Sequence, residues 1–345
     1  MAGTRGRVVR RVATGWAFAA LLALAAPTGA SAAANDELKG WMLALEVALT
    51  QPTGLDQEYA FLSATSPAVE GSRLILDNDT DLTYRISGGY NFGLDMGSLE
   101  VSYWTFDNDD KESKSPSAAV YPTLFGYGFY GLPTHLSGAT TRAGSNLKAS
   151  TLDVDYSRAL DVGEKFTFRW LAGLRTASFE EDRSLDLDGV DTYGYYYSVR
   201  QTRHLDSDAF GVKVGGRGTF GFTEHFGMEG GLAVSLLQAD SKGNSFQGIT
   251  ELSGPTTSSE RNRGEDDSAL GKIIDLDLRG TWTSGMLTVY IGYSASSWEG
   301  FVRDPNPPRT SFFPLASGRS RDSVSFNSLN AGVIFRFGSQ RLAAP

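Results

Sequence analysis

Cysteine and histidine, two of the side chains that most often act as nucleophile or general base, are scarce in this chain. It has no cysteine, and its three histidines are His135, His204 and His225. His204 lies two residues before Asp206, and a histidine beside a carboxylate can activate a water molecule for hydrolysis. Acidic residues are frequent in the polar segments of this chain, however, so a histidine close to a carboxylate is expected by chance.

Two short acidic runs offer the oxygen ligands that Ca²⁺ prefers. They are Asp77-Asn78-Asp79 and the run from Asp107 to Asp110. Neither run has the length or the glycine of a calcium-binding loop, so solvated turns are the favoured interpretation. We therefore expect no catalytic residue, no cofactor, no metal site and no enzymatic activity.

The first 32 residues have the pattern of a secretory signal peptide. Four arginines and no acidic residue precede a short apolar run, and small residues follow at Ala30 and Ala32. The whole chain has a net charge of −9, and cleavage near Ala32 would remove those arginines and leave a more acidic protein. An acidic exported protein is a poor partner for nucleic acid.

After the signal peptide, apolar and polar side chains alternate with a period of two. In one example Leu152, Val154 and Tyr156 alternate with Asp153 and Asp155. Such alternation predicts β-strands with one apolar and one polar face. Ten segments show this pattern: 41–50, 82–90, 99–103, 152–157, 166–175, 210–220, 228–236, 270–282, 287–294 and 329–337.

The connections between these segments are alternately short and long. The short ones are 93–97, 161–165, 221–225 and 283–285, and the long polar ones are 52–81, 107–147, 180–206, 240–268 and 299–322. Short turns on one side and long loops on the other are typical of an outer-membrane barrel, with the short turns in the periplasm. A soluble sandwich would also alternate, but its strands are shorter and its loops are not of two classes.

The predicted fold is an all-β, transmembrane, antiparallel up-and-down β-barrel of ten strands. Residues 33–337 form the barrel, residues 338–345 form a periplasmic tail, and both termini lie on the periplasmic side. Twelve strands are possible if residues 195–200 or 73–76 add strands at the rim. Aromatic side chains near the segment ends, such as Phe179 and Trp298 on the loop side, are interpreted as interfacial girdles.

The face opposite the apolar residues carries seven acids and seven bases, which we expect to line the lumen. They are Glu46, Arg85, Glu100, Asp153, Asp155, Arg169, Arg175, Lys213, Arg217, Glu229, Asp275, Asp277, Arg279 and Arg336. Charges facing lipid near the midplane would cost about 2–4 kcal/mol each, so an inward orientation is favoured. A barrel of about ten strands has a narrow interior, so balanced charges predict salt bridges across it.

Residue counting across the short turns predicts individual ion pairs. Arg217 is expected nearly opposite Glu229, and Arg169 and Arg175 diagonal to Asp155 and Asp153 respectively. These bridges would fill the lumen and limit passage to small solutes.

The last strand, from Asn330 to Phe337, has a glycine followed by two aromatic residues. It resembles the β-signal read by the barrel assembly machinery of Gram-negative bacteria, which implies that machinery as a partner. The chain further resembles the Legionella-type pore-forming outer-membrane barrels, over most of residues 80–337. The likeness lies in LEVSYWTFDND, LKASTLDVDYSRAL, FRWLAGLRTASF, FGVKVGGRGTFGF, GLAVSLLQAD, VYIGYSASSWEG and SFNSLNAGVIFRF.

The resemblance implies an outer-membrane location and passive passage of solutes, with no catalytic residue. The favoured function is a narrow porin-like channel for ions or small polar solutes. A structural or adhesive barrel is the alternative, with the aromatic-rich loop 107–147 or the tyrosine-rich loop 180–206 binding a partner or lipopolysaccharide. Other interpretations are that loop 107–147 folds inward as a constriction, and that the tyrosines of 180–206 extend a hairpin above the membrane. An enzyme at the rim, similar to the ten-stranded outer-membrane proteases and using His204, is the least favoured. In each case the lipid bilayer surrounds the barrel.

Overall fold

The computed structural model describes most of the exported part of the chain. The described residues are 39–54, 58–63, 72–76, 79–93, 96–122, 136–163, 165–253, 257–300 and 323–337. The predicted signal peptide and C-terminal tail lie outside them, as do His135, Asp77 and Asn78. No helix long and apolar enough to cross a bilayer occurs within these ranges.

The described residues form thirteen β-strands. Their bounds are β1 (Gly40–Thr53), β2 (Glu58–Ser63), β3 (Ser72–Ile75), β4 (Asp81–Gly93), β5 (Gly97–Lys114), β6 (Ala119–Pro122), β7 (Ser137–Gly163), β8 (Phe166–Val190), β9 (Tyr196–Gly221), β10 (Phe226–Glu251), β11 (Thr257–Ser284), β12 (Leu287–Glu299) and β13 (Ser323–Phe337).

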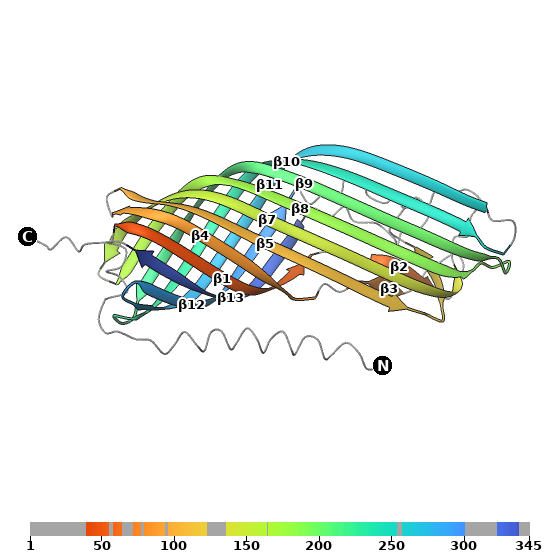
Figure 1. Cartoon of the computed structure of the whole chain (residues 1–345), viewed down its shortest axis with the longest axis horizontal. Coiled ribbons are helices and arrows are strands. Elements are labelled where there is room, and N and C mark those ends of the chain that lie inside the picture. Colours follow the sequence, from red (N-terminus) through yellow and green to blue (C-terminus); the bar gives the residue numbers. More distant parts are fainter. Residues whose placement is uncertain are drawn as a thin grey trace, which may run out of the picture.

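Ten of these strands form a closed antiparallel barrel, in the order β1-β13-β12-β11-β10-β9-β8-β7-β5-β4, with β4 pairing back to β1 (Figure 1). The predicted all-β barrel is thereby confirmed. Trp41 at the start of β1 pairs with Phe337 at the end of β13. The first and last strands thus pair with each other and close the barrel, and the Trp41–Phe337 pair lies at the end that carries the short turns.

The outward face of the barrel is apolar near the short turns. Leu174, Val212, Leu232, Leu276 and Ile291 all point outward, with 48% to 62% of their surface exposed. Exposed aliphatic side chains on every strand are what a lipid-facing band requires, because hydrocarbon chains replace water as the surroundings.

Two of the predicted long loops are strands instead. β8 and β9 continue as a hairpin up to a turn near residues 191–195, and β10 and β11 stay paired up to Glu251 and Thr257. Figure 1 shows these four strands extending beyond β1, β12 and β13. The assignment of 180–206 and 240–268 as loops was wrong because it followed apolar alternation, whereas the alternative of a hairpin at 180–206 is confirmed. Apolar alternation stops where the outer face leaves lipid, although strand pairing continues.

A small sheet packs inside this extension. It has the order β3-β2-β6, and its residues Ala60, Leu74 and Val120 belong to a buried cluster with Leu185 and Leu187 of β8. The possible rim strand at 73–76 is thus part of a separate sheet, and residues 195–200 belong almost entirely to β9. Neither adds a strand to the barrel, which keeps ten.

Candidate functional site in the barrel lumen

The structure places all fourteen predicted lumen residues around one cavity. The cavity has a volume of about 270 Å³ and reaches the periplasmic strand ends, where Trp41, Met286 and Phe337 contribute to its wall. Its ionisable lining is Glu46, Arg85, Glu100, Asp153, Asp155, Arg169, Arg175, Lys213, Arg217, Glu229, Asp275, Asp277, Arg279 and Arg336. Strand alternation explains this arrangement, since each residue has the opposite parity to the lipid-facing residues of its strand.

One group of charges is centred on Arg175 of β8. Its guanidinium donates twice to Asp153 of β7, at 2.6 and 2.7 Å, and once to Asp275 of β11, at 2.6 Å. Lys213 of β9 donates to the same Asp153 at 2.7 Å and to Asp155 at 2.6 Å. Three acids and two bases therefore share one buried network.

A second group is centred on Glu46 of β1. Tyr290 donates its hydroxyl to Glu46 at 2.7 Å, and Arg279 lies 3.4 Å from the same carboxylate. The guanidinium of Arg279 also lies over the Tyr290 ring, 4.7 Å from its centroid. Arg85 lies 3.6 Å from Glu46 on the other side.

Arg279 links this second group to one acid of its own strand and one acid of the neighbouring strand β10. It lies 3.2 Å from Asp277 and 3.9 Å from Glu229. Because its strand β11 and the strand of Glu46 have two other strands between them, the contact with Glu46 passes across the lumen. Buried charges are tolerated when each has partners of opposite sign, and this network supplies them.

Two of the three predicted ion pairs are confirmed. Arg217 lies 3.3 Å from Glu229, and Arg175 pairs with Asp153. Arg169 donates instead to Ser98 and Ser157, at 3.0 and 3.3 Å.

The third pair was wrong because the register of β7 and β8 differs from the predicted one by two residues. Asp155 lies opposite Gly173, whereas Arg169 lies opposite Ala159, so the two side chains are too far apart along the sheet. A register shift between Asp161 and Gly163, beside the turn, contributes to this difference. Counting back from the predicted turn could not detect such an irregularity.

On the loop side of the charged cavity, the lumen is filled by an apolar belt. We define the belt as Trp104, Phe106, Leu147, Ala149, Ala177, Phe179, Leu205, Ala209, Leu237, Ala239, Ile273, Trp298, Val324 and Phe326. All of them are at most 8% exposed, and they come from β5 and from every strand from β7 to β13.

Aromatic rings of the belt meet in the middle of the barrel. Phe326 of β13 lies 5.3 Å, between ring centroids, from each of Trp104, Phe106 and Trp298. Trp104 and Trp298 also lie 6.1 Å apart, although β4, β1 and β13 separate their strands around the wall. The contacts therefore span the lumen.

The belt corrects the interpretation of two aromatic residues as girdle. Phe179 and Trp298 are each 1% exposed and point inward. Residue parity predicts this inward orientation, since Phe179 is odd-numbered on a strand whose lipid-facing Leu174 is even-numbered. Proximity to the end of a segment was weaker evidence than parity.

The acidic run from Asp107 to Asp110 lies in strand β5. Asp107 and Asp109 are exposed, whereas Asn108 and Asp110 are buried on the opposite face, so the four side chains do not converge. The Asp110 carboxylate accepts a hydrogen bond of 3.0 Å from the backbone N–H of Asp79. Asp110 lies beyond Tyr103, the last apolar outward residue of β5, and therefore outside the lipid-facing band. Burial raises the pKa of the Asp110 carboxyl above the usual range.

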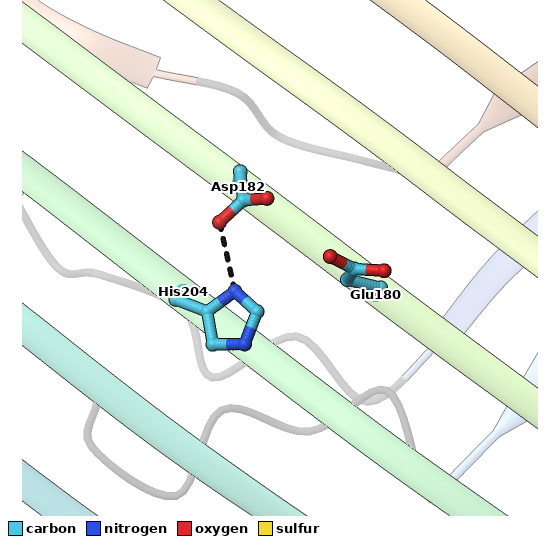
Figure 2. Close-up of side chains that lie close together, drawn as sticks. All are labelled: Glu180, Asp182 and His204. Carbon is cyan, nitrogen blue, oxygen red and sulfur yellow. Dashed lines mark hydrogen bonds and ion pairs between the residues drawn. The ribbon is translucent and has the colours of Figure 1, made fainter.

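His204 has a different carboxylate partner from the one adjacent in sequence. Its Nδ1 lies 2.7 Å from Oδ1 of Asp182, which is directly opposite in the β8–β9 ladder (Figure 2). Asp206 lies opposite Glu180. These side chains share the outward face of the sheet, whereas the buried Asp110 points inward.

The sequence of residues 34–307 matches the family described as Legionella pneumophila major outer membrane protein precursor. The chain belongs to this family. The match starts well before residue 80, where the resemblance predicted from the sequence began, and it ends before the last strand. Membership in this family, together with the closed barrel, establishes an outer-membrane protein of Gram-negative bacteria.

Two solved structures illustrate what this family member is similar to. The outer membrane protease OmpT from Escherichia coli has 9% identity and a TM-score of 0.44, with 86% of this chain and 97% of that chain covered. The Pseudomonas putida toluene transporter TodX has 8% identity and a TM-score of 0.26, with 87% and 91% covered. No curated protein matches the chain.

Proposed function

We propose that the protein is a narrow channel for ions or small polar solutes, and that the conformation described here is its closed state. The observation that carries this proposal is the combination of a charge-lined cavity with an apolar constriction directly beyond it. Hydrophobic constrictions close aqueous channels by excluding water, and rings of charge set which ions enter.

The cavity suits a conducting path on the periplasmic side. Its volume of about 270 Å³ holds several water molecules, and its fourteen ionisable lining residues include both signs of charge. Only part of this charge is fully buried, since the side chains of Arg85 and Arg217 keep 33% and 35% of their surface exposed. Small hydrated ions of either sign find partners along this wall.

The belt supports a closed state because side chains alone form it. Its aromatic rings are held by contacts with each other, and a change of side-chain rotamers around Phe326 would widen the belt without breaking any backbone pairing of the barrel. Channel gating needs such an element with two arrangements of similar energy.

A structural or adhesive barrel is the second candidate. The tip of the β8–β9 hairpin carries Tyr193, which is 84% exposed, together with the exposed Tyr195 and Tyr196. Exposed tyrosines on a rigid hairpin that extends beyond the lipid band suit the binding of a partner. In this role the lumen would stay closed permanently.

Recordings of single channels in planar bilayers separate the two functions. We expect the wild-type protein to show rare openings of low conductance, and W104A/F326A to show frequent or steady ones. Thermal melts of both proteins in detergent show whether the variant keeps its barrel.

The matched control is L82A, which removes an exposed apolar side chain from the outer face of β4. It should leave the openings as in the wild type. A silent wild type, together with a folded but equally silent W104A/F326A, would overturn the channel proposal and leave the adhesive barrel. A wide, steady wild-type pore would overturn the closed state.

A further inference from the structure

Three potential metal ligands meet on the outward face of β8 and β9, in the part of the barrel that extends beyond β1, β12 and β13. Glu180 and Asp182 lie two residues apart on β8, so they share a face, and His204 lies on β9 directly opposite Asp182. Figure 2 shows the two carboxylates and the imidazole ring on neighbouring strands. Two paired strands of a barrel hold these side chains at fixed spacing.

The site lies beyond the lipid-facing band. Outward residues of β8 are apolar up to Leu174 and become polar at Thr176 and Ser178, before Glu180 is reached. The side chains of Asp182 and His204 are 49% and 39% exposed, so ions in the external medium have access to them. They also contribute to the wall of a surface hollow of about 550 Å³.

The donor atoms are close enough for one ion. One donor atom from each of the three residues lies within 4.8 Å of the others. His204 Nδ1 and Asp182 Oδ1 are 2.7 Å apart, while two ligands of a tetrahedral Zn²⁺ with bonds of about 2.0–2.1 Å lie roughly 3.3 Å apart. Small changes of side-chain torsion angles therefore suffice to admit a metal ion.

We propose that Glu180, Asp182 and His204 form a surface binding site for a divalent cation of the Zn²⁺ class. An imidazole nitrogen with two carboxylates is a donor set that zinc and its transition-metal neighbours accept, leaving one position open. Ca²⁺ and Mg²⁺ prefer oxygen ligands alone, so the histidine selects against them.

The charges around the site favour a cation. Asp206, opposite Glu180 in the ladder, adds a third carboxylate on the same face. Lys148 on β7 is a positive partner of the site, with its Nζ 3.7 Å from Glu180 Oε2. That contact is long and exposed, so it is worth little, and an ion with two charges displaces it. A bound metal would join β8 to β9 through their side chains.

Zinc titration of the refolded full chain in detergent micelles tests the proposal. Isothermal titration calorimetry should show saturable uptake at this site, and E180Q, D182N and H204Q should each weaken it by at least about tenfold. H204Q retains a polar amide that can still contact Asp182. Zn²⁺ should also raise the melting temperature of the wild type but not that of H204Q.

The matched controls are H225Q and D188N. His225 lies at a periplasmic turn, and Asp188 is an acid of the same strand that pairs with Arg142 at 3.2 Å. Both variants should bind Zn²⁺ as the wild type does. Equal uptake by the wild type and H204Q, or no saturable uptake by the wild type, would overturn the site. Binding of Ca²⁺ as tightly as Zn²⁺ would overturn the assigned class of ion.

Discussion

Arg175 on β8 and Asp275 on β11 form an ion pair of 2.6 Å across the lumen, although two strands separate them along the wall. Arg175 is only 5% exposed and also holds Asp153. One side chain thus connects three strands of the barrel through its interior.

Removing Arg175 should destabilise the barrel strongly. R175A leaves Asp153 and Asp275 buried with fewer positive partners, and breaking a buried pair in this way costs about 3–5 kcal/mol. Urea unfolding in lipid vesicles, followed by tryptophan fluorescence, measures the change. K111A, which removes an exposed ion pair with Asp109, should cost less than about 1 kcal/mol. Equal effects of the two variants would contradict a structural role for the lumen network.

Charges of the cavity should set ion preference once the belt is opened. In the W104A/F326A background, R85Q removes a positive charge from the cavity wall and should shift the reversal potential toward cation preference. E100Q removes a negative charge from the same wall and should shift it the other way. Reversal potentials under a salt gradient report both shifts. If neither variant changed the potential, ions would be taking a path that avoids this cavity.

The stability of the extracellular wall should depend on the charge of Asp110. Burial, with Asp79 and Asp81 nearby, raises the pKa of its carboxyl in the folded protein. Because this pKa is raised on folding, protonation of Asp110 stabilises the folded protein. That stabilisation is complete below the pKa of the unfolded state and is lost as the pH rises through the pKa of the folded state.

The variant D110N keeps an oxygen that accepts the hydrogen bond from the Asp79 N–H but cannot ionise. In urea unfolding at pH 7, D110N should have a higher midpoint urea concentration than the wild type, and this difference should shrink toward pH 3. D109N, on the exposed face of the same strand, is the control. A gain that is the same at both pH values would show that the charge of Asp110 is not the cause.

Barrel insertion in cells should depend on the last residue of the seam. Phe337 resembles the terminal aromatic residue of a β-signal, and it pairs with Trp41 where the barrel closes. F337A should lower the amount of folded protein in the outer membrane while the purified chain still refolds in detergent. F222A, at an exposed periplasmic turn, should change neither. Failure of F337A in both assays would indicate lost packing rather than lost recognition by the assembly machinery.

Several features of this protein could be predicted from the sequence, because lipid imposes a simple rule on each strand. Alternation gave the ten strands, and parity placed residues such as Asp153 and Arg217 on the inner wall. The rule fails above the lipid, where the outward faces of β8 and β9 are polar and these strands resemble loops in the sequence. It also cannot fix register, which a single irregularity between Asp161 and Gly163 alters.

The candidate metal site shows the same limit. His204 and Asp206 are close in sequence, but the partner of His204 is Asp182, 22 residues earlier, because the two strands pair. Sequence spacing reveals ligands within one strand, whereas neighbours across a ladder emerge only when the register is known. The apolar belt likewise combines residues from eight strands, and each strand alone shows at most two of them.

The seam between β1 and β13 also determines when the barrel can close during folding. β1 pairs with β4 early in the sequence, but its other edge has to wait for the last strand, almost three hundred residues later. Until that moment the sheet has two free edges, each a row of unpaired backbone groups that can recruit another chain. A truncated chain ending before β13 would therefore be an open sheet prone to aggregate rather than a smaller barrel. Nascent copies consequently need to be kept from one another until β13 has been synthesised.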